Sequence, residues 1–231
     1  MTILAFDTCF GACSVALWST ARRQILAERF EVMAKGHSER IIPMIGEVLA
    51  QAGVAVDAVD ALAVTIGPGS FTGVRTGIAV ARALALANSR PIHVATSLRV
   101  MAAALRESEP GDPIAIAVAT RDGLVYFEAF EGMDLDGTVA PCLATPAAAI
   151  ALLGSKRHLL AGTGAPLLTA AAGAIDVQHR CTNAPIEPRA TALARIASRL
   201  PVAEPPKPLY LREADAKPQA GTALPFAFKR T

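Results

Sequence analysis

Aromatic residues are scarce in this sequence: they make up 5% of its 231 residues, whereas 48 residues are alanine. Cores with such a composition are packed with small side chains, so helices can approach their neighbours closely. A hydrophobic fraction of 52% excludes an intrinsically disordered chain. The length is sufficient for one large domain or for two small lobes that each have a core.

Neither sign of charge dominates, because the sequence has 22 Lys and Arg residues and 20 Asp and Glu residues, which gives a formal net charge of +2. This balance excludes nucleic-acid binding driven by bulk charge and leaves only a local basic patch. Long apolar runs are also missing: the mean hydropathy is +0.40, yet no stretch reaches the ~18–20 apolar residues of a membrane span. The first seven residues lack the basic start of a signal peptide.

The four cysteines form no CxxC pair and show no zinc-like spacing with the four histidines. We therefore expect a reduced, cytoplasmic protein that has no resident metal and does not contact a membrane. No Ser/His/Asp order stands out, and neither Cys9 nor Cys13 has a nearby histidine that would activate a thiolate. The sequence shows no catalytic apparatus.

The first half of the chain alternates strands and helices. Apolar patterning predicts three antiparallel strands, then a helix, a strand, an alanine-rich helix, a strand and a helix. Pro43 either kinks the first helix or marks its first turn. The order β-β-β-α-β-α-β-α indicates an α/β fold with a mixed sheet and helices on its faces. The predicted ranges are 3–6, 13–18, 24–32, 37–51, 60–66, 72–88, 91–95 and 98–105.

A linker at 107–113, rich in Pro, Gly and acidic residues, separates this half from a second, thinner series of elements. We divide the chain into an N-terminal lobe (1–106), a reduced C-terminal lobe (107–213) and a loosely ordered tail (214–231). The second series comprises strands at 114–119, 124–130, near Cys142 and at 158–161, and helices at 146–153, 167–172 and 189–200.

Two loops could bind an anion. The glycine-rich loop that precedes the 72–88 helix presents backbone N–H groups at a helix N-terminus, which suits phosphate or carboxylate. Alternatively, its glycines serve a tight turn and its hydroxyls cap the helix. The first hairpin could hold a hydrated metal and phosphate through its aspartate, or that residue satisfies turn hydrogen bonds. The candidate phosphate-binding residues are Asp7, Thr8, Gly11, Gly67, Gly69, Ser70 and Thr72.

Small residues recur at every fourth position of the 72–88 helix, at Gly73, Gly77, Ala81 and Ala85. Such a stripe allows close helix packing, either inside the chain or at a subunit interface. Arg75 and Arg82 are seven residues apart and share a different face, where they either pair with acids of a partner or lie in solvent.

Three strings carry a family resemblance: Phe6-Asp7-Thr8, the segment from Gly36 to Met44, and the Gly67–Arg75 string. With Pro208-Leu209-Tyr210-Leu211-Arg212 near the end, the chain resembles the TsaB (YeaZ) family, the dimerisation subunits of the bacterial complex that makes threonylcarbamoyladenosine in tRNA. The resemblance implies an actin/sugar-kinase/Hsp70-like (ASKHA, ribonuclease H-like) fold of two lobes, the second reduced.

The resemblance also implies a division of labour. The related catalytic subunit, TsaD, holds a metal with a His-x-x-x-His motif, and Ser97 and Met101 stand at those positions here. Serine is a poor ligand and methionine is soft, so the metal site should be missing. The sequence also lacks the glycine that ATP-binding members of the superfamily have between Asp7 and Thr8. We expect no cofactor on this chain alone, and ATP only within the complex.

We interpret the chain as a non-catalytic subunit that binds and activates TsaD, with the ATPase TsaE as a third subunit and tRNA bound through the complex. Alone, it would form a homodimer. The alternative is an independent ATP-dependent phosphotransferase of the same fold, and a third hypothesis is a homodimeric scaffold. The helices at 37–51 and 72–88 would form the interface, through His37, Ile41, Ile45, Val48, Gly73, Arg75, Gly77, Ala81 and Arg82.

Overall fold

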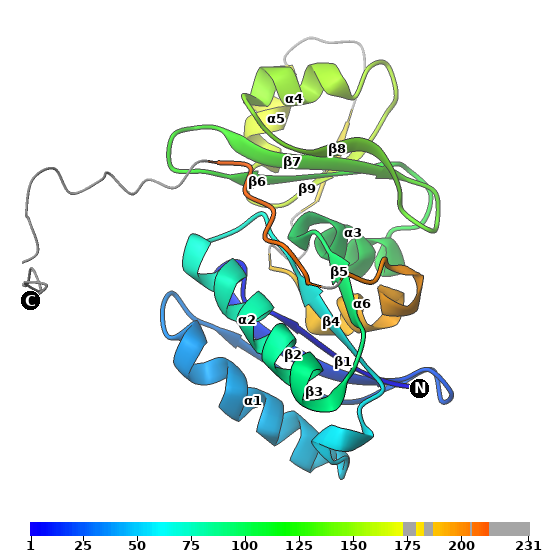
Figure 1. Ribbon diagram of the computed structural model, residues 1–231. Helices are drawn as coiled ribbons and strands as arrows, with labels where there is room; N and C mark the ends of the chain where they lie inside the picture. Colours follow the sequence, from blue (N-terminus) through cyan, green and yellow to red (C-terminus); the bar gives the residue numbers. More distant parts are fainter. Residues whose placement is uncertain (173–178, 183–186, 204, 213–231) are drawn as a thin grey trace, which may run out of the picture.

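Two five-stranded mixed sheets organise the molecule in the computed structural model, which describes residues 1–172, 179–182, 187–203 and 205–212 (Figure 1). The first sheet has the order β3-β2-β1-β4-β5, in which the first three strands are antiparallel and the last two run parallel to β1. Its strands are β1 (Thr2–Asp7), β2 (Ala12–Ser19), β3 (Gln24–Val32), β4 (Ala61–Thr65) and β5 (Ile92–Ala95).

The second sheet repeats this arrangement in the order β10-β9-β6-β7-β8, with β7 at the position of β2 and β9 at that of β4. Its strands are β6 (Ile114–Ala119), β7 (Val125–Glu131), β8 (Asp136–Ala144), β9 (Leu159–Ala161) and β10 (Arg180–Cys181). Each sheet is interleaved with three helices in the order β-β-β-α-β-α-β-α, so the predicted two-lobed fold is confirmed. The helices are α1 (His37–Ala52), α2 (Phe71–Asn88), α3 (Ser97–Ser108), α4 (Pro146–Leu152), α5 (Ala165–Ala172) and α6 (Ala190–Ile196).

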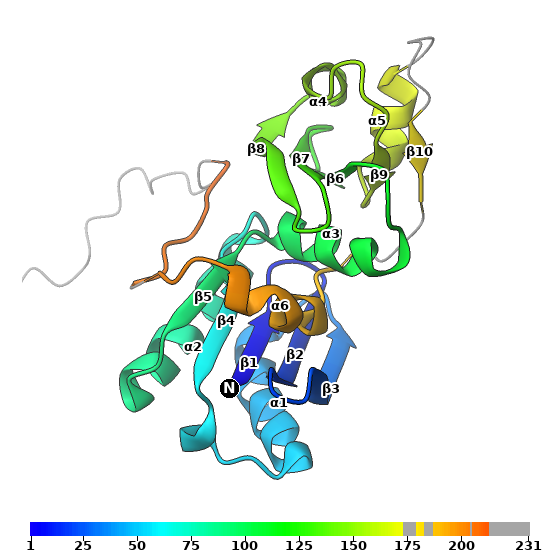
Figure 2. The ribbon, with the colours of Figure 1, turned by 90° about the vertical axis from the view of Figure 1, so that its right-hand side faces the viewer.

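The elements form five layers (Figures 1 and 2). Helices α1 and α2 cover the outer face of the first sheet, and α4 and α5 cover the outer face of the second. Helices α3 and α6 lie between the sheets, in a core built largely from alanine and leucine. The small side chains that the composition predicted therefore fill the central layer.

The two central helices are exchanged between the halves of the chain. Helix α3 follows the first sheet in sequence but packs on β6 and β7, whereas α6 follows the second sheet and packs on β1 and β2. A lobe boundary at 106/107 therefore separates each helix from the sheet that it covers. The boundary remains a proposal, and the predicted tail at 214–231 lies outside the described residues.

Most predicted elements agree with the structure to within a few residues. Pro43 lies inside α1, which continues to Ala52. The weak strand predicted near Cys142 is the nine-residue β8, and two short elements were missed: β10 and the 3₁₀ turn Val56–Ala58. No helix within the described ranges is both long and apolar enough to cross a membrane.

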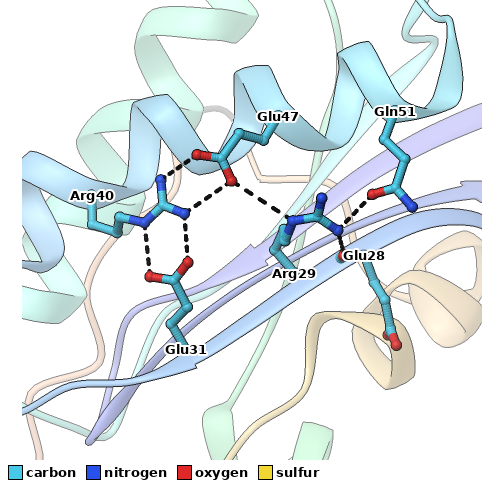
Figure 3. Close-up of polar contacts among 6 residues, drawn as sticks. All are labelled: Glu28, Arg29, Glu31, Arg40, Glu47 and Gln51. Atoms are coloured by element: carbon cyan, nitrogen blue, oxygen red, sulfur yellow. Dashed lines mark hydrogen bonds and ion pairs between the residues drawn. The ribbon is translucent and has the colours of Figure 1, made fainter.

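A network of charged side chains holds α1 against the edge strand β3 (Figure 3). Arg40 donates to both carboxylate oxygens of Glu31, at 2.8 and 2.5 Å, and to those of Glu47, at 2.7 and 2.9 Å. Arg29 lies 3.7 Å from Glu47 and donates to Gln51. Since Arg40 and Glu47 are turned toward β3, the charges of the middle of α1 are satisfied within the chain.

The segment that follows α6, residues 201–203 and 205–212, is called the strap below. It first closes the edge of the first sheet, because Val94 N–H donates to the Pro201 carbonyl at 3.1 Å and Ala203 N–H donates to Ile92 at 2.9 Å. It then crosses between the lobes, where Leu209 N–H donates to the Ile66 carbonyl at 2.7 Å. The strap is the orange segment of Figure 1.

Candidate functional site

Asp7 ends β1 and is completely buried. Its carboxylate accepts hydrogen bonds from the Thr65 hydroxyl and, at 3.2 Å, from the Cys9 N–H. Burial raises the pKa of Asp7 to about 6, and the two hydrogen bonds oppose that rise. The side chain is therefore held by its own hairpin and strand β4, and is not presented to solvent.

The glycine-rich loop packs directly on this hairpin. A Cβ atom at Gly73 would collide with the Thr8 carbonyl, and one at Gly69 would collide with the Cys9 carbonyl. Gly67 adopts φ of +103°, and a side chain there would lie 2.9 Å from the Leu209 carbonyl of the strap. These glycines are required for close approach between loops, as the tight-turn interpretation predicted.

Two backbone N–H groups of the predicted phosphate site already donate to protein atoms. Ser70 N–H donates to the Cys9 carbonyl at 2.7 Å, and Gly73 N–H donates to the Ser70 hydroxyl at 3.0 Å, so Ser70 caps α2. The Thr8 hydroxyl donates to the Gly73 carbonyl at 2.7 Å. The structure brings these loops together, but it uses their polar groups for packing. Thr72 is exposed in the first turn of α2.

A carboxylate of the chain accepts a hydrogen bond from another backbone N–H of the hairpin. Glu187 accepts from the Gly11 N–H at 3.1 Å. Burial, together with the negative charge of Asp7, raises the pKa of Glu187 to about 7. When both acids are ionised they repel a phosphate by like charge. The arrangement therefore does not support the phosphate-binding prediction for this chain alone.

The two residues at the metal-ligand positions of TsaD are also engaged inside the protein. Ser97 is fully buried and donates to the Pro68 carbonyl at 2.5 Å, while Met101 packs in the central core. Within the described part of the chain, no three His, Cys, Asp or Glu residues gather as ligands.

The predicted interface residues require a correction. Six of them are buried within this chain, because the most apolar stripe of each helix faces the chain's own sheet and not a partner. Of the other three, Arg75 and Arg82 are exposed, and His37 is half-buried. The six buried residues are Ile41, Ile45, Val48, Gly73, Gly77 and Ala81.

Part of the exposed surface of α1 and α2 is uncharged, although Glu39, Arg75 and Arg82 are exposed on the same helices. Ile42 is 52% exposed and Leu86 is 86% exposed. Around them lie a second set of small residues at spacings of four, which the sequence reading missed because a stronger stripe lies on the opposite side of each helix. The surface, called the α1/α2 face below, comprises Ile42, Pro43, Gly46, Ala50, Thr72, Ala79, Ala83 and Leu86.

One end of α2 is joined to the strap by an aromatic cluster. Arg75 lies 3.7 Å from the centre of the Phe71 ring and donates to the Tyr210 hydroxyl at 2.7 Å. The two rings stack with centroids 5.3 Å apart. At the end of the strap, Arg212 forms an ion pair of 3.2 Å with Asp122 of the second lobe.

The repeated β-β-β-α-β-α-β-α topology is that of a two-lobed, actin-like protein. A model of the family described as "TsaD: tRNA N6-adenosine threonylcarbamoyltransferase" matches residues 25–219. "YeaZ from Pseudomonas aeruginosa" superposes with a TM-score of 0.78 and 30% identity, covering 91% of this chain and 99% of that structure. The chain therefore belongs to the TsaB (YeaZ) family, within the wider family that the TsaD model describes.

Two relatives are named "tRNA threonylcarbamoyladenosine biosynthesis protein TsaB". The Escherichia coli (strain K12) protein is 37% identical over 131 residues, which cover 57% of this chain and 55% of the relative. The Haemophilus influenzae protein is 40% identical over 127 residues, which cover 55% of this chain and 52% of the relative. The chain thus matches about half the length of each.

Proposed function

We propose that this chain is a non-catalytic subunit that binds TsaD through the α1/α2 face and supports threonylcarbamoylation of the adenosine next to the anticodon in tRNA. The names of the two relatives support a role in the biosynthesis of threonylcarbamoyladenosine in tRNA. The filled hairpin and glycine loop support the lack of catalysis by this chain, since Asp7 and Glu187 stand where a phosphate would be needed.

The α1/α2 face is the observation that carries the proposal. Two long helices lie side by side on one outer layer, and their exposed middle turns carry alanine, glycine, leucine and isoleucine. Small side chains let a partner helix approach to about 8 Å between axes. Two helices of a partner laid on these two would form a bundle, with an interface of about 1,600 Å² in total.

In the complex, TsaD would carry out the transfer, TsaE would supply ATPase activity, and the assembled surface would hold the tRNA. The chain alone would bind no cofactor and would pair with a second copy through the same face. We place this assembly in the cytoplasm.

The test is a pair of leucine substitutions on the two outer layers. Leu86→Arg on α2 should weaken the affinity for TsaD about 100-fold, which corresponds to about 2.7 kcal/mol, because it replaces the most exposed large apolar side chain of the α1/α2 face with a charge. The control is Leu152→Arg on α4, where the leucine is 52% exposed. Binding is measured by calorimetry, and the melting temperature shows that both variants fold.

Equal affinity of the two variants for TsaD would contradict the α1/α2 face. The phosphotransferase alternative predicts micromolar binding of Mg·ATP by the isolated chain, followed by turnover. We expect neither, and calorimetry with a phosphate-release assay measures both.

A further inference from the structure

A groove runs along the flank of α2, between this helix and the strap. It consists of two adjoining cavities of about 670 and 290 Å³ that share Arg82 and Pro206. One wall is α2 from Arg75 to beyond the end of the helix, and the other is the proline-rich part of the strap. The groove is continuous with the α1/α2 face, because Ala79, Ala83 and Leu86 belong to both.

The charge of the groove is positive along its whole length. Arg75, Arg82 and Arg90 line it, and its described lining includes no Asp or Glu. Arg75 is held at one end by Phe71 and Tyr210, and Arg90 at the other end donates to the Asp57 carbonyl at 2.8 Å. Arg82, between them, is exposed and has no hydrogen-bond or ion-pair partner in the described part of the chain. Guanidinium groups recognise carboxylates with two parallel hydrogen bonds.

The remaining lining favours a peptide over a nucleic acid. Alanine, leucine and isoleucine side chains and three prolines form most of the walls. Apolar side chains of a peptide complement such walls, whereas a sugar-phosphate backbone does not. The prolines have no N–H, so Pro205, Pro206 and Pro208 offer no backbone donor to phosphate. Arg75 and Arg82 are two helical turns apart, about 10 Å, which suits acidic residues separated by apolar ones.

We propose that this groove binds an acidic, partly apolar segment of TsaD, the subunit that docks on the adjoining α1/α2 face. The proposal rests on the proposed function and specifies a second contact for the same partner. The α1/α2 face supplies apolar area, and the groove supplies charge complementarity, which speeds association and fixes orientation.

The first experiment reverses the free charge. Arg82→Glu should weaken the affinity for TsaD about tenfold at low ionic strength and reduce the dependence of Kd on salt concentration, because one attractive charge is replaced by a repulsive one. Arg22→Glu, in the turn between β2 and β3 and outside the groove, is the matched control and should leave both quantities unchanged. Melting temperatures confirm that the variants fold.

The second experiment identifies the occupant. Arg82→Lys keeps the charge and supplies a primary amine, so treatment of the complex with a carbodiimide should join this position to an Asp or Glu of TsaD. Mass spectrometry of the digested complex locates the linked residue. A link to a carboxylate of a second copy of this chain, or no link at all, would overturn the proposal.

The outcomes separate the two proposals. If the unchanged chain does not bind TsaD, the proposed function itself fails. If the unchanged chain binds and Arg82→Glu binds equally well, only the groove proposal fails. If Arg82→Glu leaves the affinity for TsaD intact but lowers the affinity of the complex for tRNA, the groove faces RNA, and the peptide assignment is wrong.

Discussion

The two outer layers of the molecule are built in the same chain order but differ in size. Helices α1 and α2 contain 16 and 18 residues, whereas their counterparts α4 and α5 contain 7 and 8. Both pairs cover one face of a five-stranded sheet, so covering the sheet does not by itself require the longer helices. The extra length provides outward surface, and on the first lobe that surface includes both the uncharged α1/α2 face and the exposed Arg75 and Arg82. This difference is the comparison on which our proposal rests, namely that a partner docks on the first lobe.

The lobes nevertheless share one packing device, a glycine loop set against the first strand of its sheet. Gly73→Ala should cost about 3 kcal/mol of unfolding free energy, because the new methyl group collides with the Thr8 backbone. Gly164→Ala in the second lobe should cost less, about 2 kcal/mol, because its nearest contact is a Val125 methyl group at 2.8 Å. Urea denaturation measures both losses.

Gly46→Ala is the control for these glycine substitutions. A Cβ there meets nothing within 4 Å, so the variant should gain about 0.5–1 kcal/mol from helix propensity. If Gly164→Ala lowers the free energy of unfolding by more than Gly73→Ala does, the glycine loop of the first lobe is not the more tightly packed of the two.

Buried carboxyl groups occur in both lobes. Glu128, in the second lobe, is used to test how such a group makes stability depend on pH. Burial raises the pKa of Glu128 from 4.5 to about 7, against a hydrogen bond from Thr96 and the charge of Arg99. The folded state therefore binds this proton more tightly than the unfolded state, and stability falls as pH rises from about 4.5 to about 7. Glu128→Gln should stabilise the protein by about 1–3 kcal/mol at pH 8 and leave it unchanged at pH 4.

Denaturation curves at several pH values measure this effect. A stabilisation of the same size at pH 4 would show that the charge of Glu128 is not its cause. Asp7 in the first lobe has a pKa raised in the same direction, so part of the pH dependence should persist in the Glu128→Gln variant.

The smallest effect concerns the surface ion pairs. Arg40→Met removes the centre of the network that fixes α1 on β3, whereas Lys156→Met removes a single exposed pair with Glu131 in the second lobe. We expect a small decrease in melting temperature for the first variant and almost none for the second, since isolated exposed pairs contribute little. Both decreases should vanish in ~1 M salt, where charges are screened. Equal decreases at low salt would contradict a special role for the network.

Local periodicity was sufficient to predict nearly all of the elements and the repeated order of the lobes. Short apolar, β-prone runs identified β1 and β2, alternation identified β3, and the helical spacing of Ile41, Ile45 and Val48 identified α1. The two-residue strand β10 was missed because no period can be recognised over such a short segment.

The periodicity did not reveal what covers each face. The stripe of Gly73, Gly77 and Ala81 shows that something approaches α2 closely, and the structure shows that this neighbour is the first sheet and its hairpin. The outward side of α2 also carries small residues, Ala79 and Ala83, so the presence of small side chains does not by itself show which side meets the sheet. The exchange of α3 and α6 was equally invisible, because local periodicity does not show that α6 (Ala190–Ile196) packs on strands at the start of the chain (Thr2–Ser19).

The position of α6 late in the chain has a consequence for synthesis. The face of the first sheet that α6 covers includes Ile3, Ala5 and Ala16. While the ribosome has released only the early residues, this apolar surface stays bare, because its cover has not yet been translated. A nascent chain of this protein is therefore exposed to aggregation for most of its translation, and chaperone binding should persist until residues 190–203 emerge.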